Sequence, residues 1–198
     1  MLLNLKRSAD IIVSSFFLLV LSPLLLITGV IIKVTMPGPL FFRQRRVGMH
    51  QKLFDILKFR SMKVDRSAEE SFDFDKDEER ITSFGRLIRR LKIDELPQLL
   101  NVLKGDMSLV GPRPTIEQQV EEYDAYQRRR LDVKPGMTGL AQVNGNTYLT
   151  WEERIEYDIE YVDTHSLKQD VGIILKTILI VLFGEGNFKK TERKISKG

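Results

Sequence analysis

The longest apolar run in the chain lies close to its N-terminus. Residues 11–32, IIVSSFFLLVLSPLLLITGVII, carry no charged side chain, and as one helix they would extend about 33 Å, enough to cross a bilayer. Pro23 stands in the middle of this run, where a proline removes a backbone donor and clashes with the preceding turn. Ser22 can bond a backbone group that the proline frees. The pattern therefore predicts a helix, a break and a second helix within residues 1–35.

Positive charge on both sides of the run bears on its topology. Lys6 and Arg7 precede it, and Lys33 and Arg43 follow it. Positively charged flanks favour the cytoplasmic side of a membrane, so we expect a re-entrant segment with both ends in the cytoplasm. A single crossing with a proline kink stays an alternative. A signal peptide is disfavoured because the run is long and no small-residue cleavage site follows it.

Shorter periodic patterns follow the apolar segment. Alternation in LFDIL (53–57) predicts a strand, and the acidic run 64–80 is typical of a solvated loop. Apolar residues spaced i, i+3, i+4 and i+7 over 84–91 predict an amphipathic helix. A second short helix is expected over 97–104, with Pro97 at its start and Gly105 directly after it.

The C-terminal half predicts more helix. We expect helices over 116–131 and 151–162, and a loop over 135–146, which is rich in turn formers. Residues 171–183 are apolar but too short to span a bilayer, which suits a helix in the core or in the membrane interface. Taken together, the patterns predict an α-rich α+β protein.

Composition narrows the chemistry. The 198 residues carry a formal net charge of +4, no cysteine, and two histidines, His50 and His165. Disulfides, thiolate catalysis and cysteine-based zinc sites are therefore excluded. Any metal would be a hard ion on oxygen ligands, such as Mg²⁺. The basic balance suits an anionic partner, but the basic segment 33–63 lacks an aromatic platform, so no nucleic acid is expected.

An adjacent acidic pair, Asp94–Glu95, lies in this basic chain just before the second short helix. One interpretation is helix capping, because Asp is a common N-cap. The other is phosphate chemistry: a carboxylate can attack phosphorus, or a carboxylate pair can hold Mg²⁺ against a diphosphate. Arginines that could neutralise phosphate oxygens surround the pair in sequence: Arg86, Arg89, Arg90, and Arg113 between the two prolines of VGPRP.

Several longer motifs resemble the small monotopic bacterial polyprenol-phosphate phosphoglycosyl transferases, the enzymes that initiate glycan assembly. The resemblance covers nearly the whole chain. It is carried by PGPLFFRQRRVG (37–48), KFRSM (58–62), DELPQLLNVLKGDMSLVGPRP (94–114), PGMTGLAQVNG (135–145) and WEERIEYDIEYV (151–162). The central block is long enough that a chance match is not credible.

The resemblance implies a reaction and its residues. A nucleotide diphosphate sugar, usually a UDP-sugar, gives its sugar-1-phosphate to polyprenol (undecaprenyl) phosphate, and UMP leaves. It implies that Asp94 is the nucleophile, that Glu95 assists, and that the pair binds Mg²⁺. We expect four basic residues to bind substrate: Lys58, Arg60, Arg86 and Arg113.

The resemblance also implies an organisation. A re-entrant helix over 1–35, broken at Ser22–Pro23, would hold a compact cytosolic catalytic domain, 36–188, with interfacial amphipathic helices, and 189–198 would be a basic tail. The expected place is the cytoplasmic face of the bacterial inner membrane, in contact with membrane lipid. A homo-oligomer, or contacts with downstream glycosyltransferases, is left open.

One departure and two alternatives complete the interpretation. Many family members continue QVNG with Arg-Asn, whereas Asn146–Thr147 follow Gly145 here, so sugar specificity is open.

A Mg²⁺-dependent phosphohydrolase would use the same acyl phosphate and let water attack it. A membrane-tethered adaptor that binds acidic partners through residues 33–63 would need no Asp94.

Overall fold

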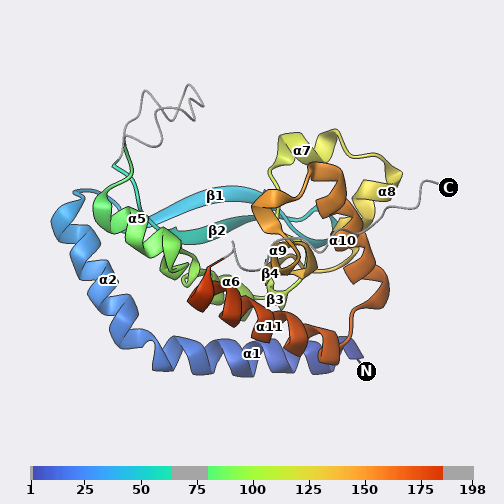
Figure 1. Cartoon of the computed structure of the whole chain (residues 1–198), viewed down its shortest axis with the longest axis horizontal. Coiled ribbons are helices and arrows are strands. Elements are labelled where there is room, and N and C mark those ends of the chain that lie inside the picture. Colours follow the sequence, from blue (N-terminus) through green and yellow to red (C-terminus); the bar gives the residue numbers. More distant parts are fainter. Residues whose placement is uncertain (1, 64–79, 185–198) are drawn as a thin grey trace. The chain divides into compact units, whose positions relative to one another are not determined.

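The computed structural model describes residues 2–63 and 80–184, so residues 64–79 of the acidic run and the whole 189–198 tail lie outside it. The described part of the chain is mostly helical, with two small two-stranded sheets, β1–β2 and β3–β4 (Figure 1). The α-rich prediction is therefore confirmed. The chain divides into two compact units, Met1–Arg45 with Asp55–Gly105 and Arg46–Phe54 with Asp106–Gly198.

The predicted break in the N-terminal segment is confirmed. Helix α1 (Leu2–Val20) ends one residue before α2 (Ser22–Thr35) begins, and the pair is bent by 61° (Figure 1). The Ser22 hydroxyl donates to the carbonyl of Leu19 at 2.8 Å. That carbonyl lies four residues before Pro23, which has no N–H to offer it, so the serine stabilises the bend.

Length and hydropathy set a limit on this pair. Within the described residues, no helix alone is both long and apolar enough to cross a bilayer, and Leu5–Val20 and Ser22–Thr35 meet the requirement only together. In α1 the polar residues Asp10 and Ser14 are buried, whereas Ile12, Phe16 and Leu19 are exposed. The helix thus turns a polar stripe inward and an apolar stripe outward.

The inward stripe of α1 packs on α6 (Gln98–Lys104). The guanidinium of Arg7 donates to the carbonyls of Val102 and Leu103, at 2.5 and 2.8 Å. These carbonyls belong to the last turn of α6, where carbonyls lack the usual i+4 partner; that of Val102 also accepts from Gly105 N at 3.0 Å. A cation at a helix C-terminus is also favoured by the helix dipole.

A hairpin and one amphipathic helix form the core of the first unit. Strands β1 (Phe41–Val47) and β2 (Leu53–Phe59) pair with each other, and the division between the two units falls within this hairpin. Helix α5 (Ser83–Arg90) follows the predicted periodicity. Its Ile88 packs with Ile32, Met36 and Phe59.

Helix α6 has the limits that the sequence predicted. Pro97 precedes it, and Gly105 ends it with φ of 91°, a left-handed conformation that favours glycine. Its buried Asn101 fixes it to β2: the side-chain oxygen accepts from Leu57 N at 3.0 Å, and the side-chain nitrogen donates to Asp55 O at 2.8 Å.

The second unit contains a parallel pair of short strands, β3 (Ser108–Val110) and β4 (Gly136–Thr138). The expected loop over 135–146 is therefore partly wrong, because it holds β4 and the short helix α9 (Leu140–Val143). A Cβ on Gly136 would lie 2.1 Å from the backbone nitrogen of Gly111. The glycines here serve a close approach of two backbones rather than turns alone.

Residues 116–131 are largely helical, as expected, but the helix is divided into separate pieces. The chain forms α7 (Glu117–Glu121), α8 (Ala125–Arg128) and the 3₁₀ turn η3 (Arg129–Asp132). Asp124 begins α8 with a capping box: its carboxylate accepts from Gln127 N at 2.8 Å, and Gln127 Oε1 accepts from Asp124 N at 3.2 Å. A strong N-cap starts a new helix where charge content alone suggested continuity.

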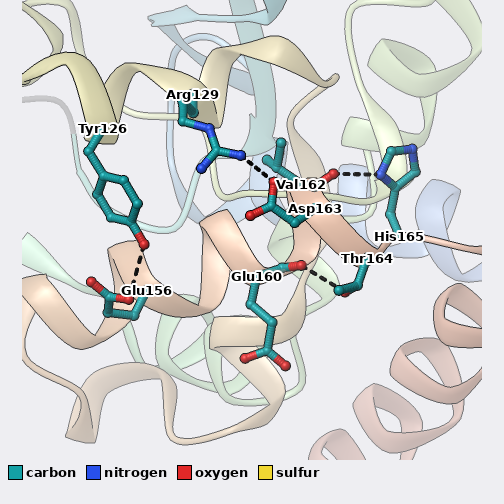
Figure 2. Close-up of polar contacts among 8 residues, drawn as sticks. All are labelled: Tyr126, Arg129, Glu156, Glu160, Val162, Asp163, Thr164 and His165. Carbon is teal, nitrogen blue, oxygen red and sulfur yellow. Dashed lines mark hydrogen bonds and ion pairs between the residues drawn. The ribbon is translucent and has the colours of Figure 1, made fainter. Parts of the chain in front are cut away.

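Helix α10 (Trp151–Thr164) and helix α11 (Leu167–Phe183) complete the second unit and agree with expectation. Figure 2 shows polar contacts of α10 with α8 and η3. Tyr126 donates to Glu156 at 3.1 Å, and Arg129 forms an ion pair with Asp163. At the C-terminus of α10, His165 Nδ1 lies 3.0 Å from the carbonyl of Val162.

The core of the second unit is closed by one tyrosine. Tyr161 of α10 is buried with Val110, Val143 and Ile173. Its hydroxyl donates to the carbonyl of Val110 at 3.0 Å and lies 2.7 Å from Asp170 Oδ1 at the start of α11. One side chain thus connects α10, α11 and β3.

Candidate functional site

The acidic pair lies in a tight turn of the first unit. Residues Ile93–Glu95 form the 3₁₀ turn η2, which Lys92 introduces in a left-handed conformation (φ 56°). This turn carries the Asp94 side chain into the unit, where the residue is only 8% exposed. A buried carboxylate thus lies immediately before α6.

Asp94 has an unusual environment for a buried carboxylate. Within the described residues, its Oδ1 atom is buried and has no hydrogen-bond partner. Burial, and next the charge of Glu95, raise the pKa of Asp94, while the cations Lys58, Arg89 and Lys92 act in the opposite direction. Buried carboxylates are normally paired, so this one is either costly to the fold or kept for a ligand.

Glu95 is paired, and its partner is a residue that the sequence assigned to substrate. Lys58 of β2 places its Nζ atom 2.6 Å from Glu95 Oε1. The contact joins two positions that lie 37 residues apart in sequence. The structure thus brings Lys58 and the acidic pair together, and the substrate role of Lys58 stays a prediction.

The capping interpretation of Asp94–Glu95 is wrong. Lys92 occupies the N-cap of η2 and Pro97 that of α6, and neither described cap receives a side-chain hydrogen bond. Asp94 and Glu95 lie inside the 3₁₀ turn instead. Their presence is therefore not explained by the usual stabilisation of a helix start.

The expected arginines of the first unit fall into different settings. Arg60 is buried, and its guanidinium donates to the carbonyls of Met36 and Pro37, which holds the loop after α2. Arg86 is exposed on α5. Arg89, one turn later, donates to Ser61 Oγ at 2.7 Å and contributes to the potential at Asp94. Arg60 therefore already has a structural task.

The expected magnesium ion can be tested against these side chains. The described residues contain no group of three or more histidine or acidic side chains that could hold a metal. Mg²⁺, however, is usually bound by one or two carboxylates together with phosphate oxygens and water. The unpartnered Oδ1 of Asp94 and the adjacent Glu95 fit that donor set.

Arg113 belongs to the second unit, where its own loop fixes its backbone. Its carbonyl accepts from Arg130 Nη2 at 3.3 Å, while its side chain is exposed. Its charge, after burial, lowers the pKa of Arg46. A small pocket is lined by Val47, Gly48, Pro112 to Thr115, Arg130, Leu131, Val133 and Pro135. The guanidinium groups of Arg113 and Arg46 influence each other here, and two such groups favour an anion.

Sequence reasoning missed the buried group that supports this loop. Arg130 forms an ion pair with Asp158 at 2.6 Å, and the two side chains are 5% and 2% exposed. Burial raises the pKa of Asp158 to about 6, against the opposing charge of Arg130. Arg130 also donates to Tyr123 and lies over the Trp151 ring. Nothing in the local pattern of 128–130, three consecutive arginines, marks the last one as buried.

A buried carboxylate without a partner, in a turn surrounded by lysine and arginine, defines a class of site. Such perturbed groups gather where proteins do chemistry, and carboxylates near cations are typical of enzymes that act on phosphate esters. The chain belongs to the bacterial sugar transferase family, whose model matches residues 2–184.

Known relatives agree with that membership. "Uncharacterized sugar transferase EpsL" of Bacillus subtilis (strain 168) is 46% identical over 182 residues, which cover 92% of this chain and 89% of that protein. A UDP-glucose:undecaprenyl-phosphate glucose-1-phosphate transferase of Klebsiella pneumoniae is 43% identical over 87% of this chain and 39% of its own length. An undecaprenyl-phosphate galactose phosphotransferase of Salmonella typhimurium is 42% identical over 93% of this chain and 42% of its own length.

Proposed function

We propose that this protein transfers a sugar-1-phosphate from a UDP-sugar to undecaprenyl phosphate and releases UMP. The observation that carries the proposal is the match of residues 2–184 to the sugar transferase family, together with relatives whose names specify glucose-1-phosphate and galactose phosphate transfer. The unpaired buried carboxylate of Asp94 supplies a candidate for the reacting group.

In the first step, a carboxylate oxygen of Asp94 attacks the phosphorus that bears the sugar. A carboxylate–phosphorus bond forms, and the bond from that phosphorus to the bridging oxygen of the diphosphate breaks. The electron pair stays on that oxygen, so UMP leaves as a phosphate monoester and no proton is needed. An enzyme-bound acyl phosphosugar remains, which is covalent catalysis in two easier steps.

In the second step, a phosphate oxygen of undecaprenyl phosphate attacks the same phosphorus. A new P–O–P linkage forms, the bond to Asp94 breaks, and the carboxylate is restored with its electron pair. Lys58, held against Glu95 at 2.6 Å, and Arg89 keep positive charge around the turn. That charge lowers the repulsion between the carboxylate and an anionic phosphate.

Asp94 and Glu95 are the residues that would hold Mg²⁺. When bound, the ion would neutralise the negative charge of the diphosphate and make its phosphorus a better electrophile. Glu95 would share its carboxylate between Lys58 and the ion. Arg113 and Arg86, both exposed, are the expected ligands of further phosphate oxygens.

We also propose that α1 and α2 enter the cytoplasmic face of the bacterial inner membrane and return to it. The bend at Ser22–Pro23, the exposed apolar stripe of α1 and its buried polar stripe support this placement. Large apolar side chains on the surface of a helix are favourable when they face lipid instead of water. Undecaprenyl phosphate keeps its phosphate at headgroup level, so a re-entrant anchor would hold the reacting turn at a suitable depth.

The test is an assay of the purified full chain in detergent with Mg²⁺. UDP-glucose and UDP-galactose are offered first, each with and without undecaprenyl phosphate, and UMP and lipid product are measured. A lipid diphosphate sugar that appears only with acceptor supports the transferase. Sugar phosphate or inorganic phosphate formed without acceptor would instead identify a phosphohydrolase, and inactivity with every UDP-sugar would favour the adaptor.

Mass spectrometry tests the covalent step separately. After incubation with UDP-sugar and Mg²⁺ but no lipid, we expect a sugar-phosphate adduct on the peptide that contains Asp94. UMP formed only in the presence of lipid, with no adduct at any time, would indicate direct transfer in a ternary complex and contradict the acyl phosphate.

A further inference from the structure

Gln98, the first residue of α6, is a buried amide whose donor is unused. The residue is 3% exposed, and its Nε2 atom is buried without a hydrogen-bond partner within the described residues. Most buried side-chain polar atoms in proteins are hydrogen-bonded, and a buried donor left unpaired lowers stability. An unpaired donor at this position therefore calls for a reason.

A second buried amide on the same helix shows that the unpaired donor is particular to Gln98. Asn101, one turn further along α6, is 1% exposed and uses both ends of its amide, on Leu57 N and Asp55 O. Helix α6 is thus capable of satisfying a buried amide through the backbone of β2. Gln98 has no such task, although it is buried almost as completely.

The position of Gln98 relative to Asp94 supplies the reason. Leu96 (φ −57°, ψ −32°) and Pro97 (φ −58°, ψ −18°) have right-handed helical backbone, so η2 passes into α6 without a change of hand. Side chains three to four residues apart on helical backbone are neighbours, about one turn from each other. About one turn therefore separates a buried acceptor, Asp94 Oδ1, from a buried donor, Gln98 Nε2, and neither atom has a hydrogen-bond partner within the described residues.

We propose that Gln98 is a further catalytic residue, whose side-chain N–H donates to a non-bridging oxygen of the phosphorus under transfer. This inference rests on the proposed function. A neutral donor suits this place, because it adds a bond to the negative oxygen without pairing with the nucleophile as a lysine would. Charge on the non-bridging oxygens is spread in the transition state of phosphoryl transfer, and preorganised donors stabilise it.

The test replaces the donor while keeping the shape. Gln98→Met has the same length and no donor, and Gln98→Glu has the same shape with an acceptor and a charge. The matched control is Gln119→Met on α7, where the glutamine is exposed. Each full-length variant is assayed for kcat and KM of UMP release with undecaprenyl phosphate present, and its melting temperature is measured without substrate.

We expect Gln98→Met to lower kcat about 100-fold, the effect of removing one transition-state donor, with a melting temperature equal to or above that of the wild type. Removing an unsatisfied buried donor costs the fold nothing. Gln98→Glu should lose more activity, because its charge repels both Asp94 and phosphate, and Gln119→Met should match the wild type.

Two results would overturn the inference. Full activity in Gln98→Met, with an active wild type, would mean that the amide makes no contact in the reaction. A fall in melting temperature in both Gln98 variants, with kcat recovering when the assay is cooled, would assign Gln98 to the fold. A wild type inactive with every UDP-sugar would contradict the proposed function itself, and the inference with it.

Discussion

Two buried aspartates, one in each unit, show opposite ways of holding a carboxylate away from water. Asp158 on α10 is 2% exposed, and Arg130 lies 2.6 Å from it. Asp94 in η2 is 8% exposed, and within the described residues its Oδ1 atom is buried without a hydrogen-bond partner. Burial is the largest cause of a raised pKa in both.

The difference separates a group that supports the fold from the group that we propose as the nucleophile. Arg130 gives Asp158 a counter-charge and connects it to Tyr123 and to the carbonyl of Arg113, so this carboxylate orders a loop. The positive charges of Lys58, Arg89 and Lys92 act on Asp94 by lowering its pKa against burial. A buried carboxylate oxygen without a partner lowers stability, which is what we expect of the reacting group that we propose.

The largest expected effect comes from Asp94→Asn. The change keeps the shape and removes the nucleophile, so UMP release should fall on the order of 10⁴-fold or more. The raised pKa of Asp94 means that the folded protein disfavours the charged form. The neutral amide should therefore leave the melting temperature unchanged or raise it at pH 7. Thermal melting and the transferase assay together check both statements.

Asp55→Asn is the control for that substitution. Asp55 lies in the same unit and pairs with Arg45 at 2.9 Å, but both side chains are largely exposed, 47% and 61%. Such a surface pair contributes about 0–1 kcal/mol, so activity should stay within a few fold of the wild type. Retained activity in Asp94→Asn would remove the proposed nucleophile and, with it, the contrast between the two aspartates.

Arg113→Lys should have the next largest effect. Lysine keeps the charge but loses the planar, two-pronged geometry that fits phosphate. We expect kcat/KM for the UDP-sugar to fall roughly 10–100-fold, equivalent to about 1.4–2.8 kcal/mol, with unchanged stability. Normal kinetics together with normal melting would show that the Pro-Arg-Pro loop is a structural turn.

Arg130→Met tests the paired carboxylate. Removing the cation takes the counter-charge away from the buried Asp158, which should cost about 3 kcal/mol at pH 8, or roughly 10 °C in melting temperature. Arg130 lowers the pKa of Asp158, so without it the carboxyl takes up a proton at a higher pH, and the loss should shrink as the pH falls from 8 towards 6. Melting curves between pH 5 and pH 8 measure this dependence.

Asp158→Asn is the matched variant, and its sign follows from linkage. The pKa of Asp158 is about 6 in the folded protein, against an ordinary 3.8. Its contribution to stability is therefore greatest below about pH 4 and is lost as the pH rises to about 6. An amide, which still accepts a bond from Arg130, should be no less stable than the wild type at pH 7. Equal damage from both substitutions would contradict the raised pKa.

The smallest effect is expected from Pro23→Ala in the N-terminal bend. Alanine restores the backbone donor to Leu19 and removes the steric clash, so a fraction of molecules should straighten and cross the membrane. The chain has no cysteine, so single cysteines introduced at positions 4 and 50 report each side. In the parent protein both should label from the cytoplasm only. Labelling of position 4 from outside in the parent would show a full crossing.

Much of the fold was predictable where the signal is local. The break at Pro23, helix α5, and the limits of α6 between Pro97 and Gly105 follow from patterns that act within one or two turns. The same holds for the choice of Asp94–Glu95 as a candidate pair. Helix over 116–131 was also predictable, but its division was not, because the break depends on one further local signal, the capping box at Asp124.

The environment of the candidate site could not be read from neighbours in sequence. Lys58 pairs with Glu95, 37 residues later in sequence. The Arg60 guanidinium donates to carbonyls 23 and 24 residues earlier. The pairing of β3 with β4 likewise joins residues Ser108 and Gly136. A basic residue near an acidic pair in sequence, such as Arg86, proved exposed, while a distant lysine supplied the contact.

The sequence by itself thus determined the family, the break at Pro23, helices α5 and α6, and the acidic pair, since these depend on residue order over short spans. Only the tertiary structure decided which charges are buried, which are paired, and that Asp94 Oδ1 and Gln98 Nε2 are buried without a partner within the described residues. The physical reason is that desolvation and hydrogen bonding depend on every segment that packs around an atom. In this chain those segments are tens of residues away in sequence. Local sequence therefore does not distinguish Asp158, which has an ion-pair partner, from Asp94, whose Oδ1 has none within the described residues.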